Sequence, residues 1–328
     1  MRQKPVFPLP LSFLNMRRFF LFLGCIFFLA GCGPTYPKDK LITSLTELCK
    51  KEYGVDVSVQ VVGKTLGVMV PLDKLLDSTL KLSPDVGDKL DGVILATSRV
   101  VLSTDHPLDF YVVVAQDKRI PGIELHLTRY IQDIRRLNYG DLSRTEYTKR
   151  MLLDFGLGLG AFSGKEEPFH LEEVQMEQFL ATQIARRMKT AFEEEPKLKE
   201  GLEIKSVHGK FIPHREASDW GSADKRFGRF VVTLEAREQF IGLLETLGKE
   251  DEEKLLGISL EIVLEVLQGY HFSAFDSVEI KFPFIDHPFV LGRDVLELYR
   301  RKKVGLAELL SPNNFNLPSY DAELLLKK

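Results

Sequence analysis

A short apolar stretch near the amino terminus constrains this chain more than any other feature. Residues 19–28 are strongly apolar and follow the basic pair Arg17-Arg18. The apolar run is about 11 residues long, whereas roughly 20 are needed to cross a bilayer. A basic pair, a short apolar stretch and the small residues Ala30 and Gly31 are typical of a secretory signal. We therefore expect an exported protein whose remaining residues fold outside the membrane.

Leu29-Ala30-Gly31-Cys32 ends this stretch and resembles the lipobox of bacterial lipoproteins. The resemblance covers residues 16–32 and no other part of the chain. It implies that Cys32 receives a diacylglyceryl group, that residues 1–31 are cut off as a signal peptide, and that the new amine is acylated. A plain signal peptide, or an uncleaved anchor with a chance cysteine, is the alternative. The residues before Cys25 match the lipobox less well, so Cys32 is the expected acylation site. Met16 is the expected start of the signal peptide.

Residues 32–39 are rich in Gly and Pro and predict a short tether. Three acyl chains exceed the two signals that stable membrane anchoring needs. The resemblance also implies a location in the cell envelope. Because Gly33 rather than Asp follows Cys32, it implies the periplasmic face of the outer membrane in a host with two membranes.

Cysteine usage limits how the fold is held together. Of the three cysteines, Cys25 would leave with the signal and Cys32 would be acylated, so Cys49 is the one remaining thiol. An exported protein with one thiol has no internal disulfide and depends on its hydrophobic core. Cys49 shares a helical face with Leu41 and Leu45, which predicts a buried, structural side chain rather than a reactive thiol.

The charge balance excludes a broad basic face for nucleic acid. Residues 1–31 hold four of the 44 basic residues and none of the 47 acidic ones, so the remainder carries a net charge of −7. Nucleic-acid binding domains usually carry clustered positive charge. No nucleic-acid partner is therefore expected.

Periodicity predicts an α+β fold with two domains, residues 40–155 and 169–311, joined by a Gly-rich linker at 156–168 and followed by a tail at 312–328. Both halves read helix, strand, strand, helix, helix, strand, helix, helix. Asp109 then corresponds to Asp276. Duplication of one domain and a chance similarity of order both remain open.

The expected elements lie at 41–51, 55–61, 66–70, 72–82, 88–103, 109–116, 123–137 and from Ser143 in the first half, and at 169–195, 202–212, 227–235, 237–247, 250–267, 276–284, 290–301 and 306–310 in the second.

The glycines of the linker do not form a nucleotide-binding loop. A phosphate-binding loop ends in Gly-Lys-Ser/Thr, and four residues separate that Gly from a first Gly. Here Gly164-Lys165 is followed by Glu166, and Leu159 stands where the first Gly is required. No cofactor is therefore expected.

The histidines give no convincing metal or catalytic pattern. His208 and His214 are six residues apart on a predicted strand, but a zinc site needs at least a third ligand. Asp105-His106-Pro107 and Asp286-His287-Pro288 fall on different sides of corresponding strands, which favours ordinary loop chemistry over a repeated acid–base pair.

These patterns favour a lipid-anchored envelope protein without a catalytic site, which acts by binding another envelope protein. The loop holding Trp220, flanked by Arg215 and Arg226, is the candidate interaction surface, because Trp and Arg are common anchors of interfaces. Trp220 packed against its own domain is the alternative for that residue. For the protein, the alternatives are a small-molecule or hydrolytic site between the domains and a structural subunit of an envelope assembly.

Overall fold

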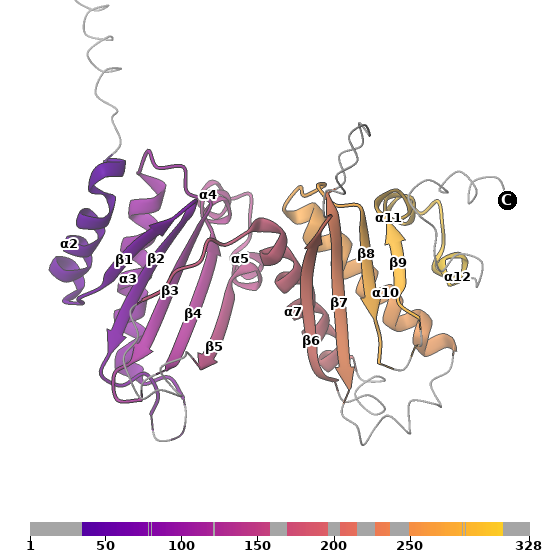
Figure 1. Ribbon diagram of the computed structural model, residues 1–328, viewed down its shortest axis with the longest axis horizontal. Coiled ribbons are helices and arrows are strands. Elements are labelled where there is room, and N and C mark those ends of the chain that lie inside the picture. Colours follow the sequence, from indigo (N-terminus) through magenta and orange to yellow (C-terminus); the bar gives the residue numbers. More distant parts are fainter. Residues whose placement is uncertain are drawn as a thin grey trace, which may run out of the picture. The chain divides into compact units, whose positions relative to one another are not determined.

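The computed structural model describes residues 35–77, 79, 81–120, 122–157, 169–195, 204–214, 227–236, 249–283, 285 and 287–310. The chain divides into two compact units between Glu173 and Val174, and each unit has its own sheet (Figure 1). The predicted α+β class, with a sheet in each of two units, is confirmed. None of the helices in the described ranges is both long and apolar enough to cross a membrane.

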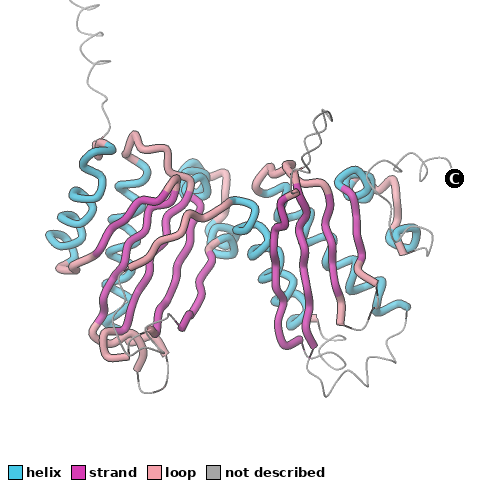
Figure 2. Tube along the Cα trace, in the orientation of Figure 1, coloured by secondary structure: helices cyan, strands magenta, loops and turns pink. Residues whose placement is uncertain are grey.

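The first unit is a five-stranded sheet in the order β1-β2-β3-β4-β5, with α2 and α3 packed on one face (Figure 2). β2 and β3 run parallel, and the other neighbours run antiparallel. Its elements are η1 (Lys38–Lys40), α2 (Leu41–Tyr53), β1 (Ser58–Val62), β2 (Thr65–Leu72), α3 (Pro84–Leu102), β3 (Phe110–Asp117), β4 (Ile123–Tyr130), α4 (Ile131–Tyr139), α5 (Arg144–Arg150) and β5 (Leu152–Leu157).

The sequence pattern explains the packing of this unit. Leu41, Leu45 and Cys49 recur every four residues and form the buried face of α2. Gly54 ends that helix in the left-handed conformation, with a φ of 66° that glycine adopts without strain. Alternate residues of the central strands point to the same core, so helix and sheet bury one continuous apolar layer.

The second unit is a four-stranded sheet in the order β6-β7-β8-β9. β7 and β8 are parallel, and the other neighbours are antiparallel. α7 packs on β6 and β7 and also contacts α10. Its elements are α7 (Met176–Glu194), β6 (Ile204–Pro213), β7 (Gly228–Ala236), α10 (Lys249–Gly269), β8 (Ser277–Lys281), β9 (Phe289–Gly292), α11 (Arg293–Arg300) and α12 (Leu306–Leu309).

The two units repeat one topology down to individual main-chain hydrogen bonds. In the first, Asp109 N donates to Lys64 O at 2.9 Å, and Ile131 N donates to Asp109 O at 2.9 Å. In the second, Asp276 N donates to Gly228 O at 2.7 Å, and Arg293 N donates to Asp276 O at 2.9 Å. In each unit the Asp therefore ties the start of the second strand to the helix after the fourth. The predicted correspondence of Asp109 with Asp276 is confirmed.

The predicted order was wrong at the same place in both halves. Residues 123–137 were expected to form one helix, but they divide into β4 and α4. Residues 290–301 were also expected to be helical, but they divide between β9 and α11. In β4, Ile123 and Leu127 have a helical spacing of four, but with Leu125 they also form a period of two, and pairing with β3 and β5 selects the strand. The segment after α5 also pairs with β4, so residues 152–157 form β5.

Residues 72–82 do not form the predicted helix. Leu72 ends β2, and Leu76 pairs with Leu82 in an isolated bridge. The Asp77 carboxylate accepts hydrogen bonds from the backbone N–H groups of Thr79 and Lys81 at 2.7 and 3.1 Å. A side chain that binds nearby backbone groups in this way favours a turn over a helix.

Residues 169–173, expected at the start of the second domain, lie instead on the sheet of the first unit. We call them the connecting strap. Gln60 Nε2 donates to Phe169 O at 2.8 Å, and Lys64 N donates to Glu173 Oε1 at 2.9 Å. Leu171 is buried beside Gly67, where a Cβ would overlap its side chain. These contacts explain why the long helix begins at Met176 rather than at residue 169. Residues 1–31, the helix predicted at 237–247 and the tail at 312–328 lie outside the described residues.

Candidate functional sites

The residues that the sequence singled out for anchoring and for partner binding lie outside the described residues. These are the proposed lipidation site, Cys32, and the proposed interaction loop with Arg215, Trp220 and Arg226. Both remain predictions. The near-miss nucleotide loop at Gly164-Lys165 also lies outside them.

Cys49 is buried in the core of the first unit, as its helical face predicted. Burial raises the pKa of its thiol to about 11, because the apolar surroundings disfavour the thiolate. A neutral, inaccessible thiol is a poor nucleophile. Cys49 is therefore part of the core rather than of a reactive site.

His208 and His214, which were weighed as metal ligands, lie on β6 and just after it. His208 is opposite Thr233, and the backbone N of His214 donates to Phe227 O at 3.3 Å. Asp286, of the second Asp-His-Pro sequence, lies outside the described residues. Within the described ranges, no group of three or more His, Cys, Asp or Glu side chains could hold a metal ion. Asp105 Oδ1 accepts a hydrogen bond from Lys38 N at 2.7 Å, so this carboxylate fixes the entry of the chain into the first unit.

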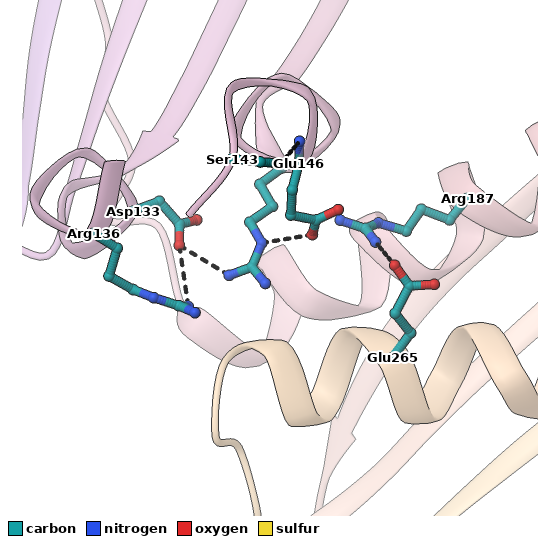
Figure 3. A network of polar contacts seen from close by, with 7 residues as sticks. Asp133, Arg136, Ser143, Glu146, Arg187 and Glu265 are labelled. Atoms are coloured by element: carbon teal, nitrogen blue, oxygen red, sulfur yellow. Dashed lines mark hydrogen bonds and ion pairs between the residues drawn. The ribbon is translucent and has the colours of Figure 1, made fainter. Parts of the chain in front are cut away.

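A buried ionic network connects α4 and α5 in the first unit (Figure 3). Asp133 Oδ1 lies 3.0 Å from Arg150 Nη1, and Arg136 Nη1 is 3.8 Å from the same oxygen. Arg150 Nε donates to Glu146 Oε1 at 2.7 Å. Asp133 and Arg150 are only 2% and 6% exposed. Ser143 Oγ caps α5 by accepting from Glu146 N at 3.1 Å, and the helix expected from Ser143 onward is present.

Arg129 forms a second polar cluster beside this network. Its Nη1 donates to Tyr147 Oη at 2.7 Å, and its Nε lies 3.3 Å from Met151 Sδ. Burial raises the pKa of Tyr147 to about 12, so the phenol stays protonated at ordinary pH. The crevice lined by these side chains is too small for a water molecule. Buried charged residues of this kind also occur in catalytic sites, but this crevice has no room for a substrate. The contacts of Arg129 instead connect α5 and the residue after it to β4.

The second unit carries an open groove of about 560 Å³ between α10 and the α11–α12 region. Its α10 wall presents Glu261 and Glu265, and the facing wall presents Tyr299, Arg300 and Lys302. Burial, followed by the charge of Glu261, raises the pKa of Tyr299. Glu265 is held by Arg187 Nη1 of α7 at 2.7 Å, as Figure 3 also shows. The groove therefore has carboxylates on one wall and cations on the other, with Leu264 and Val304 between them, and Arg187 and Glu297 offset part of each charge.

Four basic residues in a row, Arg300 to Lys303, lie at the end of α11 and just after it. A nearby carboxylate offsets part of their positive charge. Glu297 accepts hydrogen bonds from both Arg300 and Arg301. These bonds lower the pKa of Glu297 to about 2, so the carboxylate is ionised at ordinary pH and offsets part of the positive charge. Lys302, two residues beyond the end of α11, lies in the groove wall.

Sequence reasoning did not find the groove because no local pattern marks it. Glu261 and Glu265 lie one helical turn apart on α10, but an acidic pair with this spacing is common on exposed helices. Tyr299 follows more than 30 residues later. Only the packing of α10 against α11 and α12 brings the two walls together.

The sequence and fold were compared with those of known proteins. No family model, no curated protein and no solved structure matches the chain.

Proposed function

We propose that this chain is a lipid-anchored protein of the cell envelope that acts by binding another protein. The observation that carries the proposal is the basic pair and short apolar run ending in Leu29-Ala30-Gly31-Cys32. Acylation of Cys32 would hold the folded units at a membrane surface. Two observations support this function: two α+β units follow the proposed anchor in the sequence, and Cys49, the cysteine among the described residues, is a free and buried thiol.

The groove of the second unit is the described surface that best suits a protein partner. It is open, it has an apolar floor, and its two walls carry opposite charges. A polypeptide can satisfy both walls with its own charged side chains while an apolar anchor enters the floor. Leu264, half-buried on α10, contributes to that floor.

Mass spectrometry of the mature amino terminus tests the anchor. We expect Cys32 as the first residue, carrying acyl chains, and expect Cys32→Ser to prevent both acylation and membrane association. A mature end at another residue, or an unmodified Cys32, would contradict the proposal.

Crosslinking in the native membrane tests the binding role. We expect a defined protein to be crosslinked to the anchored chain, and Leu264→Lys to reduce its recovery. Leu95→Lys is the matched control, because Leu95 is an exposed leucine on α3 of the other unit. Trp220→Ala tests the interaction loop in the same way. Recovery that is equal for the parent and the Leu264 variant would exclude the groove, and no crosslinked protein at all would contradict the binding role.

A further inference from the structure

The start of the described chain is already part of the first unit. Tyr36 N donates to Ser103 O at 3.3 Å, and Tyr36 forms an isolated parallel bridge with Thr104. The Tyr36 side chain packs against the hydrophobic core. Two residues later, Lys38 N is held by Asp105. The chain is therefore fixed to the α3–β3 connection from Tyr36 onward.

Very little chain separates this fixed point from the proposed anchor. Only Gly33, Pro34 and Thr35 lie between Cys32 and Tyr36. A fully extended chain spans at most about 3.6 Å per residue, so the two Cα atoms are no more than about 14 Å apart. An acylated Cys32 would lie at the level of the lipid headgroups, so Tyr36 would have to lie near them.

One end of the first unit is defined by the same contacts. The Lys64 carbonyl accepts hydrogen bonds from Asp109 and Phe110, and Asp109 O accepts from Ile131 N. These bonds bring the β1–β2 turn and the β4–α4 junction to the end where η1 and the α3–β3 connection lie. Figure 1 shows the start of α2 and α4 at this end. The eight residues of β2 separate it from the opposite end by roughly 25 Å, at about 3.3 Å per residue.

We propose that this end of the first unit, which we call the anchor end, rests on the lipid headgroups of the membrane. The inference rests on the proposed acylation of Cys32 and adds an orientation to it. The short tether, not charge, selects this face: Lys64 at the anchor end is already paired with Asp109 at 3.0 Å. The orientation is therefore expected in uncharged phosphatidylcholine membranes as well as in anionic ones.

The buried thiol of Cys49 makes the orientation measurable. Because Cys49 is inaccessible and Cys32 is acylated, a cysteine introduced at the surface is the one that a fluorescent maleimide labels. Lys40→Cys places the label at the anchor end, and Lys74→Cys places it just after β2 at the opposite end; both lysines are exposed. The two variants lose the same charge. The full-length lipidated protein would be reconstituted in phosphatidylcholine vesicles that contain a lipid with a spin label on its headgroup.

We expect the spin-labelled lipid to quench most of the fluorescence at position 40 and little at position 74. A flexible Gly-Ser segment of about 20 residues, inserted between Gly33 and Pro34, should abolish the difference, because such a chain behaves as a random coil. Equal quenching at both positions, or quenching at position 40 that survives the insertion, would overturn the inference and leave the anchor intact. Purified protein that carries no acyl chain on Cys32 would overturn both.

Discussion

At the scale of single residues, burial in the first unit raises the pKa of two side chains and keeps them protonated. Cys49 is a thiol on a helix, yet the core around it raises its pKa to about 11 and removes it from solvent. Tyr111, also buried, has a raised pKa for the same reason, and its hydroxyl lies 3.1 Å from Ser98 Oγ. These groups remain neutral in the folded state, so they act as packing elements and hydrogen-bonding partners.

Cys49→Ala is predicted to lower the free energy of unfolding by about 1 kcal/mol through the loss of buried volume. It should also change the pH dependence. The unfolded thiol loses its proton near its ordinary value of 9.0, whereas the folded thiol keeps it to about pH 11. The unfolded state therefore binds fewer protons in this window, and stability falls as pH rises from about 9 to 11. Denaturant titrations at several pH values should show a shallower fall for the variant. Rapid maleimide labelling of the native parent would contradict burial.

Arg150→Ala is predicted to lower the free energy of unfolding by about 3–5 kcal/mol, because it removes the cation that is paired with a buried carboxylate. Asp133 is almost fully buried and lies 3.0 Å from Arg150. Arg99→Ala is the matched control, because it breaks the pair between Arg99 and Glu52 at 2.7 Å on the surface. Surface pairs contribute little, so thermal unfolding should separate the two variants clearly. Similar losses of stability would show that the Asp133 network is not buried in solution.

At the scale of elements, small residues decide how closely a helix approaches a sheet. α7 lies against β6 where Ala181 faces Gly209, and a Cβ on Gly209 would overlap the carbonyl oxygen of Ala181. Gln178 then reaches the strand: its Nε2 donates to Gly209 O at 3.1 Å, and its Oε1 accepts from Phe211 N at 3.3 Å. The amide side chain thus satisfies backbone groups on the edge strand.

Gly209→Ala is predicted to destabilise the second unit by about 3 kcal/mol, because the clash is with helix backbone that no rotamer change can move. Gly87→Ala is the control. Gly87 lies in α3 with nothing within 4 Å of the Cβ position, so alanine there should stabilise by about 0.5–1 kcal/mol. Differential scanning calorimetry would measure both changes. A neutral Gly209 variant would mean that α7 lies farther from β6.

At the scale of the whole molecule, each unit has the parts of an independent domain. Each contains a complete sheet with its own helices, and the repeated parallel pair lies at the centre of each sheet. The connecting strap belongs to the first unit by its contacts, although it follows the predicted linker. A fragment of the first unit therefore needs residues beyond β5.

Residues 35–175, expressed alone, are predicted to unfold in one cooperative transition. Residues 35–157, which lack the strap, should be less stable by about 2 kcal/mol or more, because burial of one leucine contributes about 1.5–3 kcal/mol. Leu171→Ala in the longer fragment should reproduce much of this loss. Urea titrations followed by circular dichroism would compare the three. Equal stability of the two fragments would show that the strap does not cover the sheet in solution.

The sequence by itself determined the fold class, most helices and strands of the core, and the burial of Cys49. It could do so because these features rest on local patterns: one apolar face every three to four residues in α2, and a short continuous apolar run in β3. Asp109 and Asp276 were likewise matched from the order of neighbouring elements. For the same reason the secretory and lipobox-like pattern, which lies within 17 residues (16–32), could be recognised without a fold.

Tertiary structure alone decided the elements whose local pattern fits two periods and the surfaces that distant segments build. Residues 123–130 satisfy helical and strand spacing equally, and the ladders to β3 and β5 select β4. Phe169 and Leu171 became a strap because Gly67 leaves room on the sheet. The groove needs α10 and α11, which are separated in sequence. These features depend on strand pairing and packing between segments that are far apart in the sequence. A short stretch of sequence does not contain those contacts, so only the folded chain shows these features.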